Sequence, residues 1–347
     1  MKRLPVDDLE HVYQNTQNIW ESYRGKSIFL TGGTGFFGKW LLESFIYINQ
    51  KLGLNAKITI LSRNPEQFLN ANTFYREHLS NVNFIKGDVL NFGYDIDDHF
   101  DYIIHGATAA SDILNKESPL LMLDTIISGT TKILDFANKQ KLKGFLFISS
   151  GAIYGKQPES VQYINESDSF KVDINNPNSA YAEGKRVAEL YCSIYATKYN
   201  LPIKIARCFA FVGPYLPLDT HFAIGNFINN FINNENITIK GDGTPLRSYL
   251  YSSDLTIWLW KILAQGGTNS VYNVGSNESI SIAGLAKKVL DNNNGENLKI
   301  VISQPNSNNE QLQYVPSINK AISELGLSVK IDLETAIKKT KLFYLNK

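Results

Sequence analysis

The sequence predicts an α/β protein with a doubly wound parallel sheet and a smaller, mixed α/β lobe in its C-terminal part. Short apolar runs alternate with longer helical stretches from Ser27 to Cys208, and this alternation is typical of parallel strands joined by crossover helices. The alternation is lost after Pro214, where loops and single helices mix with short extended pieces. The length of 347 residues suits one large domain or two intimately joined ones.

The individual elements follow in chain order. A weak helical pattern over residues 1–24 ends at Arg24-Gly25-Lys26. Strands are expected within 27–33, 58–62, 83–88, 101–107, 144–150 and 202–214, and helices within 38–50, 64–79, about 117–140 and about 180–199. These elements predict a helical extension over 1–25, a sheet domain over 26–210 to which 249–275 returns, and a smaller lobe made of 211–248 and 276–347.

The composition disfavours several classes of protein. The chain is 43% hydrophobic and 19% charged, with 34 Lys plus Arg against 33 Asp plus Glu, so neither disorder nor binding of nucleic acid is expected. Cys192 and Cys208 belong to no C-x-x-C or Cys/His cluster and are expected to be reduced packing residues. No metal site is expected. No apolar run reaches the roughly 18 residues of a membrane span, and the first residues lack a signal-peptide core, so we expect a cytoplasmic protein without a membrane partner.

A glycine-rich turn lies between the first strand and the first long helix. Its sequence, Thr31 to Gly38, reads TGGTGFFG, and the strand–turn–helix context is what makes such a pattern indicative of a dinucleotide site. Gly32 is expected to form the tight turn, Gly35 to let the backbone approach a diphosphate, and Gly38 to pack the helix. The helix N-terminus then faces the diphosphate with its unpaired N–H groups. The residues expected around the cofactor here are Gly32, Thr34, Gly35, Phe36, Phe37 and Gly38. The sheet domain is therefore predicted to be an NAD(P)-binding Rossmann domain.

The end of the second strand bears on the choice between NAD and NADP. A carboxylate at this place would hold the 2′-hydroxyl of the ribose, but this chain has Ser62 and Arg63. A guanidinium suits a 2′-phosphate because it carries a fixed charge and several donors. The sequence therefore favours NADP, with NAD still possible.

The next two strand ends provide further candidate cofactor contacts. Asp88, followed by Val89, ends the third strand and is placed to accept a hydrogen bond from the adenine amino group. His105 and Ala107 end the fourth strand, where small residues let the dinucleotide lie close. A solvated Asp88 and a packed His105 are the alternatives.

Tyr181 and Lys185 lie four residues apart on one face of a predicted helix. A free phenol ionises near pH ~10, and a nearby cation favours the phenolate, so the pair could serve as an acid/base at neutral pH. Lys185 would also reach the nicotinamide ribose. The pair lies about 30 residues after Ser149-Ser150, which ends the fifth strand. Both elements should therefore meet at the same sheet edge as the glycine turn.

Together, these motifs resemble the extended short-chain dehydrogenase/reductase family, in particular its nucleotide-sugar epimerases, dehydratases, decarboxylases and reductases. The resemblance covers nearly the whole chain from about residue 26. The segments that carry it are TGGTGFFG (31–38), GDV (87–89), HGATAA (105–110), SSGAIYG (149–155), YAEGKRVAE (181–189), GDGTPLRSYLYSSDL (241–255), YNVGS (272–276) and YVPSINKAISELG (314–326).

The resemblance implies roles for four residues and an assembly. Ser150 would hydrogen-bond the reacting sugar oxygen, Tyr181 would transfer its proton, and Lys185 would position the cofactor. Arg247 would grip the diphosphate of a nucleotide-diphosphate sugar, with a structural ion pair as the alternative. Family members commonly dimerise through the helices that correspond to 117–140 and 180–199, so a homodimer is expected.

Two departures from the family pattern narrow the expected chemistry. The sugar 4,6-dehydratases have an Asp-Glu pair directly after the Ser/Thr, and the UDP-glucuronate decarboxylases keep the Glu, whereas this chain has Gly151 and Ala152. Neither residue can move a proton, although Glu166 or Glu183 could be recruited. Ala210 stands where the family usually has a substrate-contacting Asn, a role that Asn226 could take.

The expected function is hydride transfer at one sugar carbon, with C4 as the favoured position. This chemistry is expected because it needs only Ser150, Tyr181, Lys185 and the nicotinamide. Such an enzyme is a keto-sugar reductase if the cofactor exchanges, and an epimerase if the cofactor stays bound. A 4,6-dehydratase or a decarboxylase is the alternative, and an inactive dinucleotide-binding sensor is a remote one.

Overall fold

The computed structural model describes residues 2–92, 99–108, 112–220, 222–291, 298–304 and 312–345. Residues 109 and 110 of the segment HGATAA and the Asn-rich stretch 292–297 lie outside these ranges. The chain divides into two compact units. The first unit comprises 1–153, 172–208 and 256–272, and the second comprises 154–171, 209–255 and 273–347.

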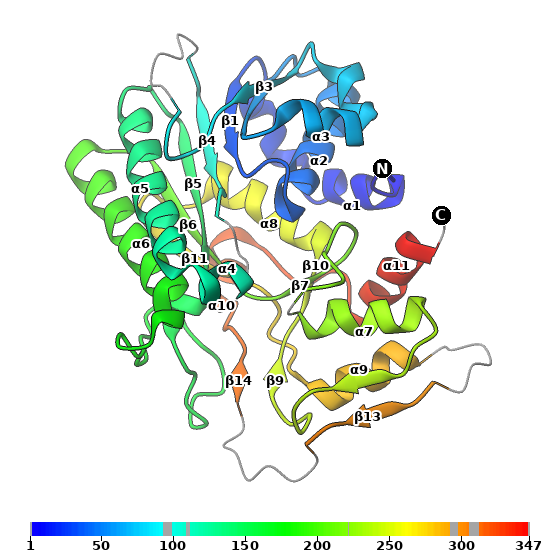
Figure 1. Ribbon diagram of the computed structural model, residues 1–347. Helices are drawn as coiled ribbons and strands as arrows, with labels where there is room; N and C mark the ends of the chain where they lie inside the picture. The colour runs from blue at the N-terminus through cyan, green and yellow to red at the C-terminus, as the bar shows by residue number, and fades with distance from the viewer. Residues whose placement is uncertain are drawn as a thin grey trace. The chain divides into compact units, whose positions relative to one another are not determined.

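The first unit is built around a seven-stranded sheet, with the strand order β11-β6-β5-β4-β1-β2-β3 (Figure 1). Strands β1 to β6 pair in parallel with their neighbours. The strands are β1 (Ser27–Thr31), β2 (Lys57–Ser62), β3 (Val82–Lys86), β4 (Tyr102–His105), β5 (Gly144–Ser150), β6 (Ile203–Cys208) and β11 (Ser270–Val274). The predicted doubly wound α/β fold is confirmed, and each of the six expected strands is present.

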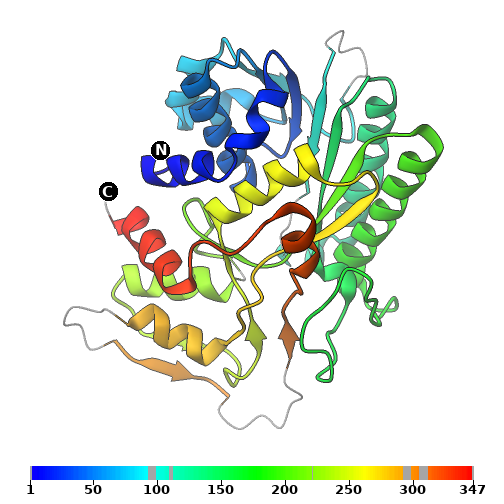
Figure 2. The ribbon, with the colours of Figure 1, turned by 180° about the vertical axis from the view of Figure 1, so that it is seen from behind.

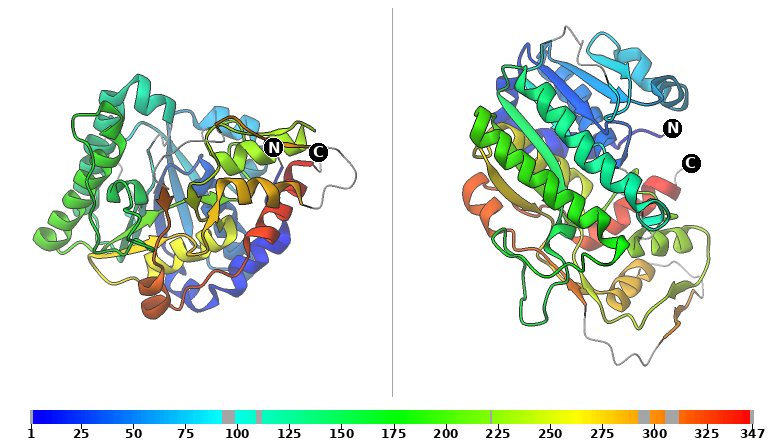
Figure 3. Two further views of the ribbon diagram at one scale, coloured as in Figure 1. Left: turned by 90° about the horizontal axis from the view of Figure 1, so that it is seen from below. Right: turned by 60° about the vertical axis from the view of Figure 1, so that its left-hand side comes forward.

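Helices cover both faces of this sheet. On one face, α5 (Pro119–Asn138) and α6 (Ala180–Tyr199) lie side by side (Figure 3, right). Their apolar residues, such as Ile126 and Cys192, share a buried core with strand residues such as Phe29 and Phe147. This packing places the N-terminal end of α6, with Tyr181 and Lys185, beside β5.

On the other face lie α2 (Phe36–Leu52), α8 (Ser252–Gln265) and the N-terminal segment (Figure 2). That segment forms α1 (Val6–Gln14) and the 3₁₀ helix η1 (Gln17–Tyr23). Trp20 is fully buried against Trp260 of α8, with ring centroids 5.0 Å apart. Residues 6–14 and 17–23 are therefore helical, in agreement with the expected helical extension, and their buried side chains belong to the core of the first unit.

The remaining helical elements of the first unit are short. They are α3 (Pro65–Ala71), η2 (Thr73–His78), α4 (Asp112–Glu117), η3 (Gly151–Tyr154, whose last residue belongs to the second unit) and η4 (Pro177–Ser179).

In its described residues, the second unit combines small sheets with several helices. The sheets are β12-β9-β14, β10-β7 and β13-β8. Their strands are β7 (Phe211–Val212), β8 (Ile237–Ile239), β9 (Leu246–Arg247), β10 (Leu250–Tyr251), β12 (Ile280–Ser281), β13 (Ile300–Ile302) and β14 (Gln313–Tyr314). The helices are α7 (Ala223–Ile232), α9 (Ile282–Leu290), α10 (Asn319–Leu325) and α11 (Leu333–Leu345). This content agrees with the expected mixed α/β lobe.

Some boundaries differ from the expectation. Residues 249–255 were expected to return to the sheet domain but belong to the second unit. Residues 154–171 were also expected within the sheet domain but belong to the second unit. The reason is backbone pairing with a distant part of the chain: Ile164 bridges to Pro316, and the Asn273 side-chain amide donates to the Ile164 carbonyl at 2.8 Å. Such pairing leaves no local pattern in the sequence.

Candidate active site

The glycine turn joins β1 to α2 with very little space to spare. Gly32 has φ +77°, and a Cβ there would lie 2.7 Å from the backbone of Gly106. A Cβ on Gly38 would lie 2.3 Å from the Gly32 carbonyl oxygen and 2.4 Å from Gly33. Gly32 therefore forms the tight turn and Gly38 packs the helix against it, which agrees with the roles expected for both.

Gly35 differs from these two glycines. It is the N-cap of α2, it is exposed, and its φ of −83° is open to any residue. A Cβ there would meet no protein atom closer than 3.5 Å. Because the protein's own packing does not require a glycine, the space beside Gly35 fits a group that approaches the backbone from outside. Thr34, Phe36 and Phe37 are part-exposed around it, and α2 has no side-chain cap. These residues fit a dinucleotide diphosphate at a helix N-terminus.

Many of the candidate residues of the first unit lie at or just after the carboxyl ends of four neighbouring strands. In the sheet, β5, β4, β1 and β2 are adjacent, so Ser150 and Ser62 are separated by three strand spacings, about 14 Å. The glycine turn lies between them, where the strand order reverses. Open α/β sheets bind ligands at this kind of switch point.

At the end of β2, Arg63 is on the surface. Its side chain is 78% exposed, and its Nε lies 4.0 Å from Asp88 Oδ2. Asp88 also accepts a hydrogen bond from the Leu90 N–H at 2.9 Å. Ser62 is part-exposed and Val89 is buried. Arg63 and Asp88 are thus close enough to serve one end of a dinucleotide, although an exposed pair of this kind adds little stability by itself.

His105 is a packing residue, which was the alternative for it. Its side chain is buried, with Nδ1 2.7 Å from Thr31 Oγ1 and Nε2 3.2 Å from Thr130 Oγ1. Burial lowers the pKa of the ring to about 3, so it stays neutral at physiological pH. Thr31 Oγ1 also accepts from the Ala107 N–H at 3.1 Å. Thr31 Oγ1 therefore contacts both the His105 ring and the Ala107 backbone next to the glycine turn.

Ser150 and Tyr181 are brought together by β5 and α6. Ser150 is part-exposed at the end of β5, and its hydroxyl lies near the phenol of Tyr181. Burial of the phenol raises the pKa of Tyr181, and the nearby Ser150 hydroxyl lowers it to a smaller extent. The expectation that Lys185 lowers this pKa does not hold here, because the lysine ammonium makes its contacts elsewhere.

Lys185 is buried beside β5. Its Nζ donates to the Ile148 carbonyl at 2.9 Å and to Thr108 Oγ1 at 3.0 Å, and it lies 4.8 Å from the centre of the Phe147 ring. Burial lowers the pKa of Lys185 to about 8. Thr108 is therefore a site residue that the sequence analysis missed. It lies within the quoted segment HGATAA, but no spacing rule points to it.

Asn115 is a second residue that the sequence analysis missed. Its Oδ1 accepts from the backbone N–H of Tyr181 at 3.0 Å, and its Nδ2 donates to the Asn178 carbonyl at 2.6 Å. It thus satisfies an N–H in the first turn of α6, where intrahelical acceptors are absent. The residue comes from α4, 66 positions earlier, so no local signal identifies it.

Arg247 lies in the second unit, on β9. Its Nη1 donates to the Leu246 carbonyl at 2.8 Å, and burial lowers its pKa. Tyr249 and Tyr314 are the ionisable groups that act on it. Within the described ranges no carboxylate pairs with it, so the alternative of a structural ion pair is not borne out there. A part-buried guanidinium without an acidic partner suits an anionic ligand. Asn226 is part-exposed on α7.

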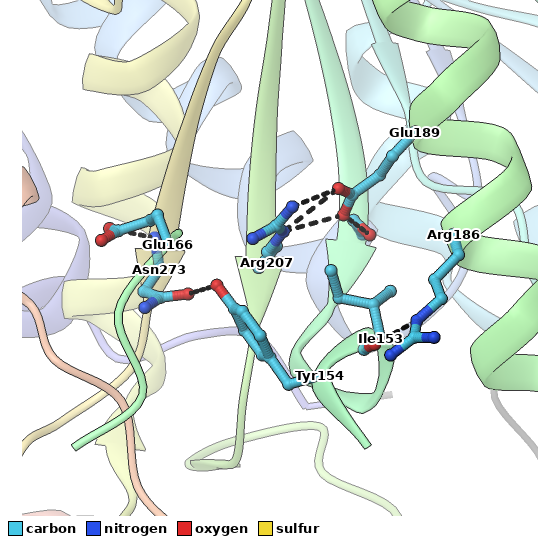
Figure 4. A network of polar contacts seen from close by, with 8 residues as sticks. Ile153, Tyr154, Glu166, Arg186, Glu189, Arg207 and Asn273 are labelled. Atoms are coloured by element: carbon cyan, nitrogen blue, oxygen red, sulfur yellow. Dashed lines mark hydrogen bonds and ion pairs between the residues drawn. The ribbon is translucent and has the colours of Figure 1, made fainter. Parts of the chain in front are cut away.

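The two carboxylates considered as substitutes for the missing Asp-Glu pair both have other contacts. Glu183 pairs with Arg186 at 3.3 Å on the surface of α6. In the second unit, Glu166 accepts from the Asn273 N–H at 2.9 Å, and Asn273 Oδ1 accepts from the Tyr154 hydroxyl at 2.6 Å (Figure 4). Ser150 is followed directly by the non-ionisable residues Gly151 and Ala152.

The part of the chain that the structure describes contains no group of three or more His, Cys, Asp or Glu residues that could hold a metal ion. None of the helices in the described ranges has the length and apolarity of a transmembrane span.

The fold and this set of residues define an enzyme of the nicotinamide-dependent α/β class. Residues 28–275 match the model of the NAD dependent epimerase/dehydratase family. The chain belongs to that family.

Curated relatives include enzymes of two activities. The chain is 30% identical over 278 residues to dTDP-D-glucose 4,6-dehydratase of Dictyostelium discoideum, which covers 77% of this chain and 62% of the relative. It is 29% identical over 316 residues to UDP-glucuronic acid decarboxylase 2 of Arabidopsis thaliana, which covers 90% of this chain and 67% of the relative. The chain thus spans about two-thirds of the length of these two proteins.

Among solved structures, the UDP-glucose 4-epimerase of Thermotoga maritima has a TM-score of 0.77 and 22% identity, and the match covers 92% of this chain and 98% of that one. The dTDP-glucose 4,6-dehydratase of Bacillus anthracis, solved with NAD, has a TM-score of 0.73 and 21% identity, covering 92% and 96%. At these identities the similarity shows the fold alone.

Proposed function

We propose that this protein oxidises or reduces a nucleotide-diphosphate sugar at one sugar carbon and acts as a keto-sugar reductase or an epimerase. C4 is the favoured reacting carbon. One observation carries the proposal. The Ser150 hydroxyl is near enough to the Tyr181 phenol to lower its pKa, Lys185 lies on the same face of α6 as Tyr181 and contacts β5, and the two residues after Ser150 have no ionisable group. These residues have what hydride transfer at a carbinol carbon needs, and the two positions directly after Ser150 do not supply the additional acid and base needed to eliminate water.

Each residue has a distinct task in this chemistry. The nicotinamide, when bound, accepts or supplies the hydride. Tyr181 takes the hydroxyl proton as the carbonyl forms and returns it on reduction, while Ser150 hydrogen-bonds the same oxygen. Lys185, whose ammonium is close to the ends of β4 and β5, orients the cofactor ribose. In the second unit, Arg247 binds the substrate diphosphate and Asn226 contacts the substrate.

The alternative is a 4,6-dehydratase or a decarboxylase, and the names of the curated relatives favour it. Either reaction would have to recruit a carboxylate or another proton carrier. Glu183 pairs with Arg186, and Glu166 accepts a hydrogen bond from the Asn273 N–H. Both carboxylates therefore already have partners. An inactive sensor stays remote, because Tyr181 and Lys185 are both present.

The proposal is tested by incubating the purified protein with a panel of nucleotide sugars, with and without NADPH, and analysing the products by mass spectrometry. Expected products are a C4 epimer or, with NADPH, a reduced keto sugar. Nucleotide-activated glucose should give no appreciable 4-keto-6-deoxy product, which absorbs in alkali. Appearance of that product would contradict the proposal and show that another group moves the extra proton.

The choice of cofactor is a separate proposal. The family is described as NAD dependent, but Ser62 and the exposed Arg63 suit a 2′-phosphate. We expect NADP(H) to bind more tightly than NAD(H). Arg63→Ala should remove this difference by deleting roughly 1 to 3 kcal/mol of charge-assisted hydrogen bonding. The matched control is Arg76→Ala, which removes another surface guanidinium, paired with Glu66. Calorimetry that shows tighter NAD binding by the unmodified protein would reverse the assignment.

The assembly proposed is a homodimer formed through α5 and α6. The support is a set of exposed apolar side chains on these helices, Leu120, Leu121, Leu190 and Ile194, since such patches mark association surfaces. Analytical ultracentrifugation should give the mass of two chains, and a mass of one chain at micromolar concentration would exclude the dimer. The cytoplasmic location stays a prediction.

A further inference from the structure

The face of α6 that carries Tyr181 and Lys185 has a third member, Glu189. The three residues are spaced by four, so they lie on one side of the helix. Each contacts the end of β5: Tyr181 contacts Ser150, Lys185 contacts the Ile148 carbonyl, and Glu189 accepts from Ser149 Oγ at 2.5 Å. The proposed function gives roles to the first two members only.

Glu189 is also held by Arg207 on the next strand. Arg207 Nη2 lies 2.7 Å from Glu189 Oε2, and its Nε lies 3.1 Å from both carboxylate oxygens (Figure 4). The side chains are 12% and 9% exposed. Ser149 is the register partner of Arg207 across the β5–β6 pair. One carboxylate therefore joins a helix and two strands next to Ser150.

A second contact holds the other side of Ser150. Arg186 Nε donates to the Ile153 carbonyl in η3 at 2.5 Å (Figure 4). Ser150 therefore lies between two points, Ser149 and Ile153, that are both bound by side chains of α6.

The energetics indicate what this arrangement does. Removing two charges from water costs several kcal/mol per ion, so a buried ion pair adds little net stability compared with well-packed apolar residues. It does, however, fix geometry, because a carboxylate with several hydrogen bonds tolerates little displacement. A displacement of about 1 Å at a reacting group can cost ~10²-fold in rate.

We propose that Glu189, held by Arg207, is a positioning residue that sets the distance between Ser150 and Tyr181 by fixing α6 against the ends of β5 and β6. The proposal rests on the function proposed above for Ser150 and Tyr181. Glu189 and Arg207 do not touch the substrate or the cofactor in this role.

The test replaces the pair with apolar residues of similar size, Glu189→Leu together with Arg207→Met, so that no charge is left buried alone. We expect a melting temperature close to that of the parent, because such replacements are often neutral or stabilising. We expect kcat to fall by roughly 10- to 100-fold while KM for the nucleotide sugar stays within threefold. The matched control is Lys26→Met. This change breaks an ion pair with Asp101 at the amino ends of β1 and β4 in the same sheet and should leave kcat unchanged.

A crystal structure of the double variant provides a readout that needs no substrate. An increase of about 1 Å or more in the Ser150 Oγ to Tyr181 Oη distance, relative to a crystal structure of the parent, supports the proposal. An unchanged distance overturns it, and so does a stable double variant with parental kcat. If the parent protein converts no nucleotide sugar, the proposed function fails, and the crystal structure still decides the role of Glu189. If the double variant does not fold, Glu189→Gln, which keeps the side-chain volume, is examined by the same two readouts and the same criteria.

Discussion

Replacing Tyr181 with phenylalanine should lower turnover by about 10²-fold or more, the usual scale for a positioned acid/base. The reason is that Tyr181 is the residue proposed to provide the proton at the reacting oxygen, with the Ser150 hydroxyl near its phenol. Binding of the nucleotide sugar should survive, since Arg247 is untouched. The measurements are kcat by product analysis and substrate affinity by calorimetry. Tyr195→Phe is the matched control, since it removes another phenol of α6, one bonded to Asp135 at 2.5 Å, and should keep the parental turnover.

Lys185→Met should lower turnover to a similar extent and should also weaken cofactor binding. The double variant with Tyr181→Phe should lose much less than the product of the two single losses, as expected of residues that act as a unit. Fully multiplicative losses, or a Tyr181→Phe protein with near-normal turnover, would show that these residues are not the catalytic pair.

Gly38→Ala should lower the stability of the protein, whereas Gly35→Ala should weaken cofactor binding. A Cβ on Gly38 would lie 2.3 Å from the backbone oxygen of Gly32, so Gly38→Ala should cost about 3 kcal/mol or more of folding free energy. At about 2.1 cal/mol/K of unfolding entropy per residue, that lowers Tm by roughly 4 °C or more for a chain of 347 residues. A Cβ on Gly35 meets no protein atom within 3.4 Å and its φ is −83°, so Gly35→Ala should fold normally.

The effect of Gly35→Ala should appear in cofactor affinity instead. A methyl group in the space that the diphosphate needs costs about 1 to 3 kcal/mol of overpacking, which corresponds to roughly 5- to 150-fold weaker binding. Thermal unfolding and calorimetry with NAD(H) and NADP(H) separate the two effects. Unchanged affinity in Gly35→Ala, or an equal loss of stability in both variants, would contradict the assignment of the glycine turn.

The order of strands and helices, the glycine turn and the Tyr181–Lys185 pair could be predicted from the sequence, whereas the role of Ser150 was implied only by the family resemblance. Each of the predicted features depends on short-range physics: the period of apolar residues, the conformational freedom of Gly32, and the spacing of one helical turn between Tyr181 and Lys185. Such signals depend only on residues that are close together in the sequence, so they can be recognised without knowledge of the tertiary structure.

The partners of the buried polar groups were decided only by the tertiary structure. His105 contacts Thr31, 74 residues away, Lys185 contacts Thr108, 77 residues away, and residues 154–171 pair with a segment near 316. The tertiary structure also reversed the expected direction of the Tyr181 pKa shift, because burial of the phenol outweighs the other influences on it. The physical reason is the same in each case. These contacts depend on sheet order, register and burial, which bring together residues whose separation along the chain carries no periodic signal.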